Sequence, residues 1–486
     1  MQAPDHTHRA IHATLWSAIE ITARYGMQFV VTVVLARILA PADFGLIAML
    51  LVFTTIGALL ANSGFGTALV QRQHTTADEE TTVFFLTLAI SGVVAAALFI
   101  AAPAIAGLYS QPGLTALTRL FVWVLPLGAL SAVPDAILTR TLNFRARASA
   151  EVIASTAAGC IAVALAWRGY GAWSIAWQAI ISTGLRTLFL WVFSGWRPLG
   201  RFHLPASRKL FGFGGYMLMT NLLDVAATRL QSLLIGLLFD SRTLGYYAVA
   251  QNTQQAPTSF IAGILNRVGL PLFSSVAHEK RRLLGALRLS LRVSMFLFVP
   301  CMLGIAIIAK PLIGLLYGAR WLPAAPLLTV LALGASVWPL HVLNLAAISA
   351  QGRSDLFFKL GLVKKIVAII LVLVASPAGA LAIAWSTVAA SAFSVAVNTH
   401  YSRKLLGYGI FAQLADQKAV ALLSCISALC GWSILHWNPP SQLFTVCAVV
   451  VSAAVYLGLA IAFRSLAMLE LMHLLRRLLK RRQIPT

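Results

Sequence analysis

The chain has 486 residues, of which 59% are hydrophobic and only 10% are charged, so an ordinary soluble domain is excluded. The 37 Lys and Arg outnumber the 14 Asp and Glu, but the sequence contains no separate soluble basic domain that would bind nucleic acid. The composition indicates a polytopic membrane protein.

Stretches of about 20 mostly apolar residues, the length that a helix needs to cross a bilayer, recur along the chain. They predict an all-α polytopic membrane protein with about 14 transmembrane helices. Their order predicts two pseudo-symmetric six-helix lobes, residues 1–194 and 212–404, joined by a basic cytoplasmic linker at 195–211. Two C-terminal helices (405–464) and a basic amphipathic cytoplasmic tail (465–486) follow.

An internal repeat supports the division into two lobes. The stretch LARILAPADFGLIA at 35–48 and the stretch IGLLFDSRTLGYYA at 235–248 each end an apolar helix in a polar turn. Gly45 aligns with Gly245, and two later pairs of stretches repeat at slightly larger offsets, as in a duplicated helical unit. We expect Gly45 to let the turn bend and Asp43 to cap the second predicted span.

Positive charge alternates between the predicted loops. Lys and Arg accumulate on the cytoplasmic side of a membrane, and most of them fall in alternate loops when the N-terminus is placed inside. The pattern therefore predicts cytoplasmic N- and C-termini. Within the basic linker, Pro198 and Pro205 predict that the chain does not continue as one helix.

Ionisable residues inside the predicted spans indicate where the function resides. A charged side chain at membrane depth costs at least about 2.5 kcal/mol, so it is found there when it is paired or faces water or a ligand. In the first span, Glu20, Arg24 and Gln28 are spaced by four residues and share one helical face. The seventh span, its counterpart in the repeat, has a comparable polar stripe. The candidate cavity residues outside the first span are Asn62, Arg186, Asn221, Asp224, Arg229, Gln251 and Gln255.

Two interpretations of these polar residues remain open. In the first, Glu20 and Arg24 form an ion pair within their helix and the amides hold neighbouring helices together. In the second, which we favour for the whole set, the polar faces of both lobes line a cavity near mid-membrane. Arginine there suits an anion such as a phosphate, and amides suit sugar hydroxyls. Glu20 or Asp224 would balance that charge or bind a coupling cation.

Several stretches resemble one family of membrane transporters. They include LARILAPADFGLIAMLLVF followed by GFGTALVQR, and later RTLNF, GYGAW, LGYYAVAQ and YGARW, in family order between about residues 12 and 355. The chain resembles polysaccharide transporters of the Wzx type, in the multidrug, oligosaccharidyl-lipid and polysaccharide exporter superfamily. Past the twelfth predicted span the resemblance is only topological.

This resemblance implies a flippase of the bacterial inner membrane that moves undecaprenyl-diphosphate-linked oligosaccharides for the synthesis of exopolysaccharide, capsule or O-antigen. It implies alternating access between the lobes, with the sugar diphosphate in the polar cavity and the prenyl tail in lipid. The cationic cavity of the family maps onto Arg24, Arg229 and Arg186. The implied partners are the lipid-linked oligosaccharide, membrane lipids and a polysaccharide polymerase with its chain-length machinery, and the implied functional unit is a monomer.

Other function classes fit the sequence less well. A multidrug or cation antiporter of the same superfamily favours acidic cavities, whereas arginines here match or outnumber carboxylates within the spans. A membrane polymerase or acyltransferase needs convergent acid and base groups, and His341 is an isolated intramembrane histidine. No nucleotide-binding P-loop occurs. We therefore expect no enzyme activity, cofactor or metal, and transport that equilibrates its substrate or uses an ion gradient or the membrane potential.

Overall fold

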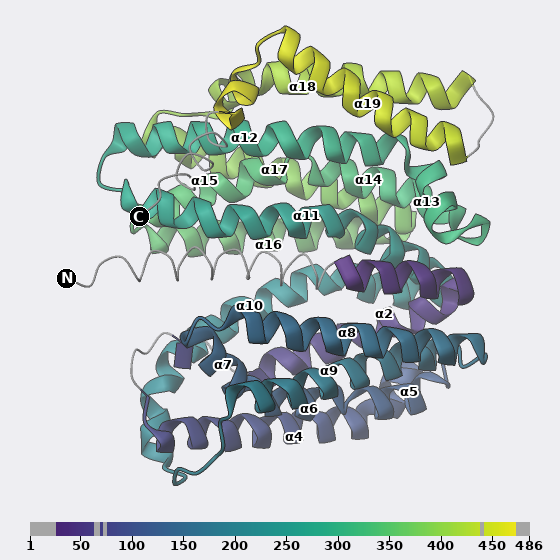
Figure 1. Ribbon diagram of the computed structural model, residues 1–486, viewed down its shortest axis with the longest axis vertical. Coiled ribbons are helices and arrows are strands. Elements are labelled where there is room, and N and C mark those ends of the chain that lie inside the picture. Colours follow the sequence, from purple (N-terminus) through teal and green to yellow (C-terminus); the bar gives the residue numbers. More distant parts are fainter. Residues whose placement is uncertain (1–25, 63–68, 71–74, 438–441, 473–486) are drawn as a thin grey trace, which may run out of the picture. The chain divides into compact units, whose positions relative to one another are not determined.

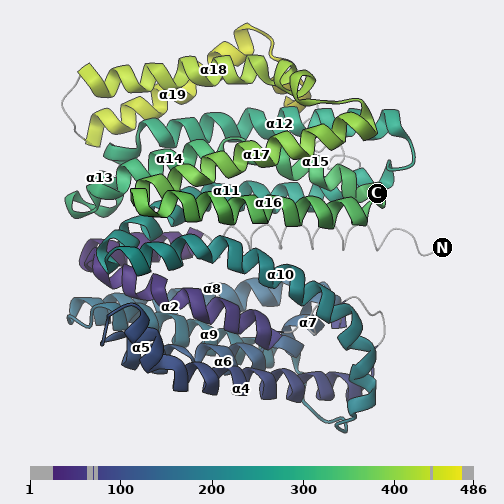
Figure 2. The same cartoon turned by 180° about the vertical axis from the view of Figure 1, so that it is seen from behind.

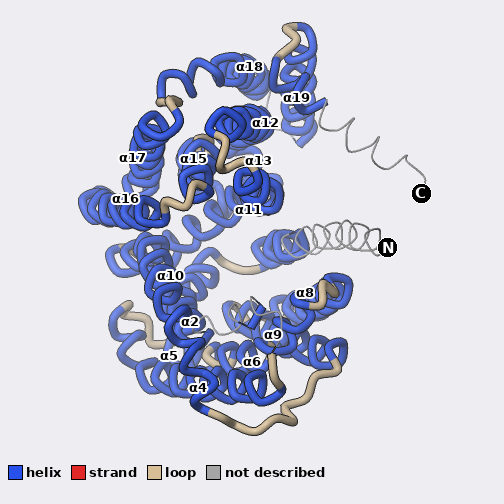
Figure 3. Tube along the Cα trace, turned by 90° about the vertical axis from the view of Figure 1, so that its left-hand side faces the viewer, coloured by secondary structure: helices blue, strands red, loops and turns tan. Residues whose placement is uncertain are grey.

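The computed structural model describes residues 26–62, 69–70, 75–437 and 442–472, and within these ranges it contains helices, turns and loops but no β-strand. Figure 3 shows these helices joined by loops. The prediction of an all-α membrane protein is confirmed by this architecture. The chain forms two compact units, Met1–Ala248 and Val249–Thr486, which we describe separately.

The first unit is a helical bundle in which α8 and α9 pack closely along their lengths (Figure 1). The chain reverses between them at Gly169 and Gly171, whose φ angles of 83° and 54° lie in the left-handed region that glycine adopts without a steric penalty. Its helices after the first segment Gly26–Ile38 are α2 (Pro41–Asn62), α4 (Ala77–Leu108), α5 (Leu114–Phe121), α6 (Val124–Leu130), α7 (Ala132–Arg140), α8 (Phe144–Trp167), α9 (Ala172–Ser194) and α10 (Leu204–Leu238).

The second unit is a bundle entered through α11 (Ser241–Ser275), a helix that begins in the first unit. A core of buried apolar side chains includes Leu287, Phe296 and Tyr456. Its further elements are α12 (Lys280–Ile307), α13 (Ala309–Tyr317), η1 (Ala319–Ala324), α14 (Ala325–Ala335), α15 (Trp338–Ala350), α16 (Ser354–Ala375), η2 (Ser376–Ala378), α17 (Ala380–Leu406), α18 (Ile410–Trp437) and α19 (Gln442–Ala462).

Within the described residues, 11 helical segments are long and apolar enough to cross a membrane. Two of them combine shorter helices: Leu114–Arg140 contains α5 to α7, and Ala319–Ala350 contains α14 and α15. The other predicted spans correspond to the segment Gly26–Ile38, to α11 and to α16, which carries three lysines. The predicted total of about 14 spans is therefore compatible with the observed helices.

Helix α10 packs with the first unit, although the sequence assigned it to the second lobe. It contacts α2 and α4, and Figure 2 shows it alongside α2. The contact is close because Gly236 has no side chain: a Cβ there would lie 2.8 Å from Cε1 of Tyr109, just beyond the end of α4. The packing division after Ala248 thus falls later in the chain than the predicted linker at 195–211.

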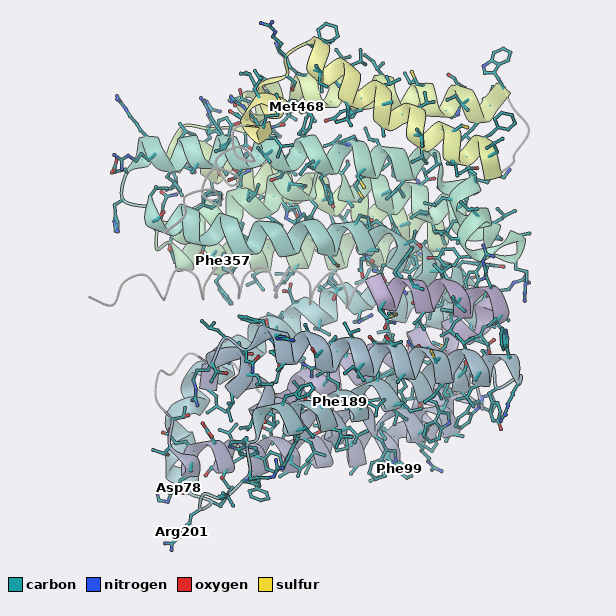
Figure 4. The ribbon with its side chains drawn as sticks, viewed as in Figure 1. Asp78, Phe99, Phe189, Arg201, Phe357 and Met468 are labelled. Atoms are coloured by element: carbon teal, nitrogen blue, oxygen red, sulfur yellow. The ribbon has the colours of Figure 1, made fainter. Side chains whose placement is uncertain are left out.

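The segment between α9 and α10 is held against the start of α4. Residues 195–203 are not helical, as the prolines predicted, whereas 204–211 already belong to α10. The backbone N–H of Arg201 donates to Oδ1 of Asp78 over 2.7 Å, and Figure 4 shows both residues at this end of the unit. The N–H groups of Gly200 and His203 donate to the hydroxyls of Thr81 and Thr82, over 3.0 and 2.9 Å. This part of the linker therefore belongs structurally to the first unit.

The prediction for Gly45 in the first repeat turn is wrong, whereas the prediction that Asp43 caps the second span is supported. Gly45 lies inside α2 and does not have a left-handed φ, so it does not bend the turn. Asp43 also lies inside α2, in its first turn, and its Oδ2 accepts a 3.0 Å hydrogen bond from the N–H of Ala40, just before that helix. Its Oδ1 accepts a 3.0 Å hydrogen bond from the N–H of Ala172, at the start of α9. Asp43 therefore caps α9 as well as α2, since the N-cap residue of α9, Gly171, has no side chain to do so.

The two C-terminal helices are attached to the second unit by polar contacts as well as by the apolar core. Asn344 of α15 and Gln413 of α18 exchange two hydrogen bonds of 2.8 Å, and both side chains are fully buried. Ser402 of α17 donates to the same amide oxygen of Asn344 over 2.6 Å. Near the end of the described chain, Glu470 accepts from Arg292 of α12 over 2.8 Å. The amide groups of Asn344 and Gln413 are thus satisfied by each other, as their burial requires, whereas Oε2 of Glu470 has no hydrogen-bond partner among the described residues.

Candidate functional site

Arg186, one of the predicted anion ligands, lies in a network of charged side chains. Its Nε is 2.9 Å from Oε2 of Glu151 on α8, and its Nη2 is 3.1 Å from Oδ1 of Asp135 on α7. Arg147, one turn before Glu151, contacts the same Asp135 oxygen with its Nε at 2.8 Å. We call these four residues the α7–α9 ion network. It joins three consecutive helices of the first unit.

The α7–α9 ion network contains two positive and two negative side chains, so its formal charges balance. The side chains of Glu151 and Arg147 are only 14% and 18% exposed. Removing one partner from such a desolvated cluster leaves an uncompensated charge and costs several kcal/mol. Sequence reasoning did not identify Asp135 or Glu151 as partners, although the four-residue spacing of Arg147 and Glu151 on a helix was a detectable signal.

Arg229 has a different environment. It lies half-buried in α10, and within the described residues its side chain makes no hydrogen bond or ion pair. Its helix is one of the segments able to span a membrane. A guanidinium there remains charged and is costly to leave without a partner, so it is the described arginine best placed to receive an anion.

The other predicted cavity residues have varied surroundings. On α10, Asn221 is half-buried and Asp224 is exposed, and their spacing of three places them on one helical face. On α11, in the second unit, Gln251 is half-buried and Gln255 is exposed. Gln28 is exposed in the first described helix. Glu20 and Arg24 lie outside the described residues, as does the side chain of Asn62.

A polar cluster in the second unit was not expected from the sequence. Nζ of Lys364 on α16 donates to Oδ1 of Asn398 on α17 over 3.1 Å. The amide nitrogen of Asn398 donates in turn to the backbone carbonyl of His341 on α15 over 2.7 Å. The cluster links three helices through the backbone of His341. Lys364 lies in the middle of α16 and Asn398 in the second half of α17, and no periodic pattern within one helix could have paired them.

A buried carboxylate anchors the cytoplasmic end predicted for α4. Glu80 is 8% exposed, and its Oε1 accepts from Nη2 of Arg140 over 3.0 Å. Its Oε2 accepts from Nε1 of Trp196, in the segment between α9 and α10, over 2.9 Å. The linker is therefore held both by its backbone and by this indole. These contacts suit a structural role rather than ligand binding.

The turn before α11 is ordered by a local carboxylate. Oδ1 of Asp240 accepts a 2.9 Å hydrogen bond from the N–H of Thr243. This hydrogen bonding lowers the pKa of Asp240 below its ordinary value, because it favours the ionised carboxylate. This hydrogen bond caps the N-terminus of α11 and fixes the turn that precedes it.

Solved structures with the same fold are membrane transporters. The chain matches lipid II flippase MurJ in an inward closed conformation with a TM-score of 0.70 and 14% identity, over 95% of this chain and 99% of that one. An inward-facing multidrug resistance MATE family transporter matches with a TM-score of 0.61 and 14% identity, over 82% of this chain and 99% of that one. At these identities the likeness shows the fold alone.

Curated relatives act in polysaccharide biosynthesis. The succinoglycan biosynthesis transport protein ExoT of Rhizobium meliloti (strain 1021) is 30% identical over 66% of this chain and 65% of its own length. The lipopolysaccharide biosynthesis protein WzxC of Escherichia coli (strain K12) is 26% identical over 73% of each chain. The alignment with ExoT thus spans slightly less than two thirds of that protein.

The family model described as "Polysaccharide biosynthesis protein" matches residues 34–326, which is more than half of the chain. That range includes the repeat turns around Gly45 and Gly245, the α7–α9 ion network and Arg229. The resemblance to polysaccharide transporters inferred from the sequence motifs is confirmed. The chain belongs to this family of polysaccharide biosynthesis proteins.

Proposed function

We propose that the protein is a flippase that translocates undecaprenyl-diphosphate-linked oligosaccharide units across the bacterial inner membrane. Membership in a polysaccharide biosynthesis family and the fold of a lipid flippase support this proposal. The proposed orientation has both termini in the cytoplasm, as the alternation of basic loops predicts. The proposed partners are membrane lipids and a polysaccharide polymerase with its chain-length machinery, and the proposed functional unit is a monomer.

The observation that carries the proposal is the half-buried Arg229, with no hydrogen-bond or ion-pair partner in the described part of the chain. A diphosphate offers oxygens that a guanidinium grips through two parallel hydrogen bonds. The amides of Asn221 and Gln251 would suit hydroxyls of the attached sugars. The lipid tail would remain in the bilayer, since its transfer to an aqueous cavity would cost about 0.8 kcal/mol for each CH₂ group.

Translocation in this proposal occurs by alternating access, in which the cavity opens first to the cytoplasm and then to the other side. The energy source would be an ion gradient or the membrane potential, with Glu20 or Asp224 binding the coupling cation. Flipping in vesicles before and after the gradients are collapsed tests this coupling. An unchanged rate would eliminate Glu20 and Asp224 as coupling residues.

The decisive experiment measures flipping of purified undecaprenyl-diphosphate-linked oligosaccharide in vesicles that contain the protein. We expect Arg229→Ala to lower the rate about 30-fold while the protein inserts normally, because a charge-assisted hydrogen bond contributes about 2 kcal/mol. Arg24→Ala is expected to abolish export in cells. Arg119→Ala, at an exposed arginine of α5, is the matched control and should leave the rate unchanged.

Two results would contradict the proposal. Vesicles with wild-type protein that flip the lipid-linked oligosaccharide no faster than protein-free vesicles would exclude the flippase function. Export of cationic drugs by the same vesicles would instead support the multidrug antiporter that the MATE-like fold also allows. Normal polysaccharide output by the Arg24→Ala variant, without accumulation of the inner-leaflet intermediate, would exclude Arg24 from the cavity.

A further inference from the structure

The two glycines that align in the repeat contact each other's helices. Gly45 is the fifth residue of α2 and Gly245 the fifth of α11. A Cβ placed on Gly45 would lie 1.7 Å from the backbone oxygen of Ser241. A Cβ placed on Gly245 would lie 1.9 Å from the backbone oxygen of Pro41. All four residues belong to the first unit, and we call their contact the glycine seam.

The glycine seam is reciprocal. The repeat offset of 200 residues that pairs Gly45 with Gly245 also pairs Pro41 with Ser241. Each glycine therefore faces the first carbonyl of the helix that contains the other glycine. Such a self-matched contact is the signature of a two-fold axis, here a pseudo-symmetric one that relates the two copies of the repeat. The seam thus forms where an element of one copy meets its equivalent in the other.

In the glycine seam the two backbones lie very close together, yet little free energy is needed to separate them. Glycine lets two backbones approach until a Cα–H points at a carbonyl oxygen, a contact that contributes about 0.5–1 kcal/mol. The facing atoms are backbone oxygens, which cannot rotate away as the end of a long side chain can. Neither glycine has a left-handed φ, so close approach is what requires glycine at these positions.

Apolar neighbours seal the glycine seam. Phe44, Leu244 and Tyr246, which adjoin the glycines in the chain, are 8%, 0% and 8% exposed. Ala48, one turn beyond Gly45, is 8% exposed. A contact of this kind excludes water while it is closed.

We propose that the glycine seam is the gate on the outer side of the transporter, closed in this structure and separated when substrate leaves the cavity. The assignment to the outer side and the release step rest on the proposed function. The seam requires glycine because any side chain at Gly45 or Gly245 would hold the helix starts apart. Alanine at either position would therefore favour the open gate.

The test measures the accessibility of one cysteine from outside the cell. Ala48→Cys is introduced after the five natural cysteines, Cys160, Cys301, Cys425, Cys430 and Cys447, have been replaced. A membrane-impermeant maleimide is then added to intact cells. We expect Gly45→Ala or Gly245→Ala to increase the labelling rate of this cysteine about 5- to 100-fold, the range that corresponds to the cost of overpacking a close contact.

Gly107→Ala and Gly304→Ala are matched controls, because no atom would lie within 4 Å of a Cβ at either helical glycine. They should leave the labelling rate unchanged. Equal labelling in the seam variants and in these controls would overturn the proposal. The labelling needs no lipid-linked substrate, so its outcome is independent of flipping. Altered labelling in a protein that does not flip the substrate would reject the proposed function. Flipping by a protein whose labelling is not altered by the glycine substitutions would reject the gate.

A second measurement applies if an alanine variant does not reach the membrane. In the chain with both glycines, Ala48→Cys is compared with Trp167→Cys, at a residue that is 77% exposed just before the turn between α8 and α9. Without substrate, the cysteine at position 48 should react at least about tenfold more slowly, as expected for a buried site. Equal labelling rates at positions 48 and 167 would show that the seam is open without substrate. A labelling rate at position 48 that does not rise during measured flipping would show that the seam is not a gate.

Discussion

Arg186 and Arg229 are both arginines within predicted membrane spans of the first unit, and the same sequence argument proposed both as anion ligands. Arg186 is surrounded by carboxylates, with contacts of 2.9 Å to Glu151 and 3.1 Å to Asp135. Arg229 has no hydrogen-bond or ion-pair partner in the described part of α10 or its surroundings. The comparison teaches that an arginine at membrane depth signals either helix assembly or ligand binding, and that its neighbours decide between the two roles.

The difference has an energetic basis. The charge of Arg186 is already compensated, so an incoming phosphate would have to compete with two carboxylates and would be repelled by both. Arg229 carries the cost of a partly desolvated charge in the absence of ligand, and a bound anion would repay that cost. Binding is therefore favoured at Arg229, and folding stability depends on Arg186.

The largest expected effect is the loss of stability in Arg186→Ala. This variant leaves Asp135 with Arg147 alone and deprives Glu151 of a 2.9 Å partner, so we expect the free energy of unfolding to fall by about 3 kcal/mol. Thermal unfolding of the detergent-purified protein would show a lower Tm. The double variant Arg186→Gln with Glu151→Gln should recover most of the loss, because it keeps a neutral hydrogen-bonding pair. An unchanged Tm together with lost transport would indicate that Arg186 binds the substrate. The proposed difference in role between Arg186 and Arg229 would then be wrong.

Arg229 variants should show the opposite behaviour. Arg229→Gln is expected to keep the wild-type Tm and to lower flipping of lipid-linked oligosaccharide by about 30-fold, because an amide carries no charge. Arg229→Lys should keep part of the activity, since an ammonium attracts phosphate but does not form the bidentate contact. Flipping rates in vesicles and Tm values of the same preparations measure both quantities. A drop in Tm equal to that of Arg186→Ala would indicate that Arg229 also serves folding.

The smallest expected effect concerns Asp240, an exposed charge whose partner is local. Asp240→Ala removes the cap at Thr243 and should lower stability by about 1 kcal/mol, whereas Asp240→Asn, which keeps a capping oxygen but loses the charge, should lower it by less at neutral pH. Because the folded-state pKa of Asp240 is lowered, its ionised form contributes stability above the unfolded pKa of about 4, and this contribution is lost as the pH falls through the folded value. Unfolding of the wild type and of Asp240→Asn between pH 3 and pH 7 compares the two profiles. Identical profiles would show that this carboxylate has no charge-dependent role.

Much of the fold could be predicted from the sequence because apolar length and charge alternation act locally. Every helix from α2 to α19 overlaps or connects apolar stretches that are visible without a structure. The break before α10 followed from prolines, whose missing N–H and fixed φ do not depend on tertiary contacts. The polar face of α10 that carries Asn221 and Asp224 followed from helical spacing in the same way.

The errors concern residues whose role depends on a distant partner. Asp43 was assigned to the nearest helix start alone, yet it also caps α9, 129 residues later in the chain. Gly45 was assigned to a turn, yet it serves a backbone contact with Ser241. The carboxylate partners of Arg186 come from α7 and α8, and no periodic pattern in one helix connects them.

By itself, the sequence determined a duplicated, helical, membrane-spanning chain of the polysaccharide biosynthesis family, because hydrophobic length, repeat offsets and family motifs are properties of the chain order. Only the tertiary structure decided which arginine is compensated and which is not, and what the repeated glycines do. Charge compensation and close approach are distances between atoms far apart in sequence. Packing sets those distances, and composition and spacing do not encode them.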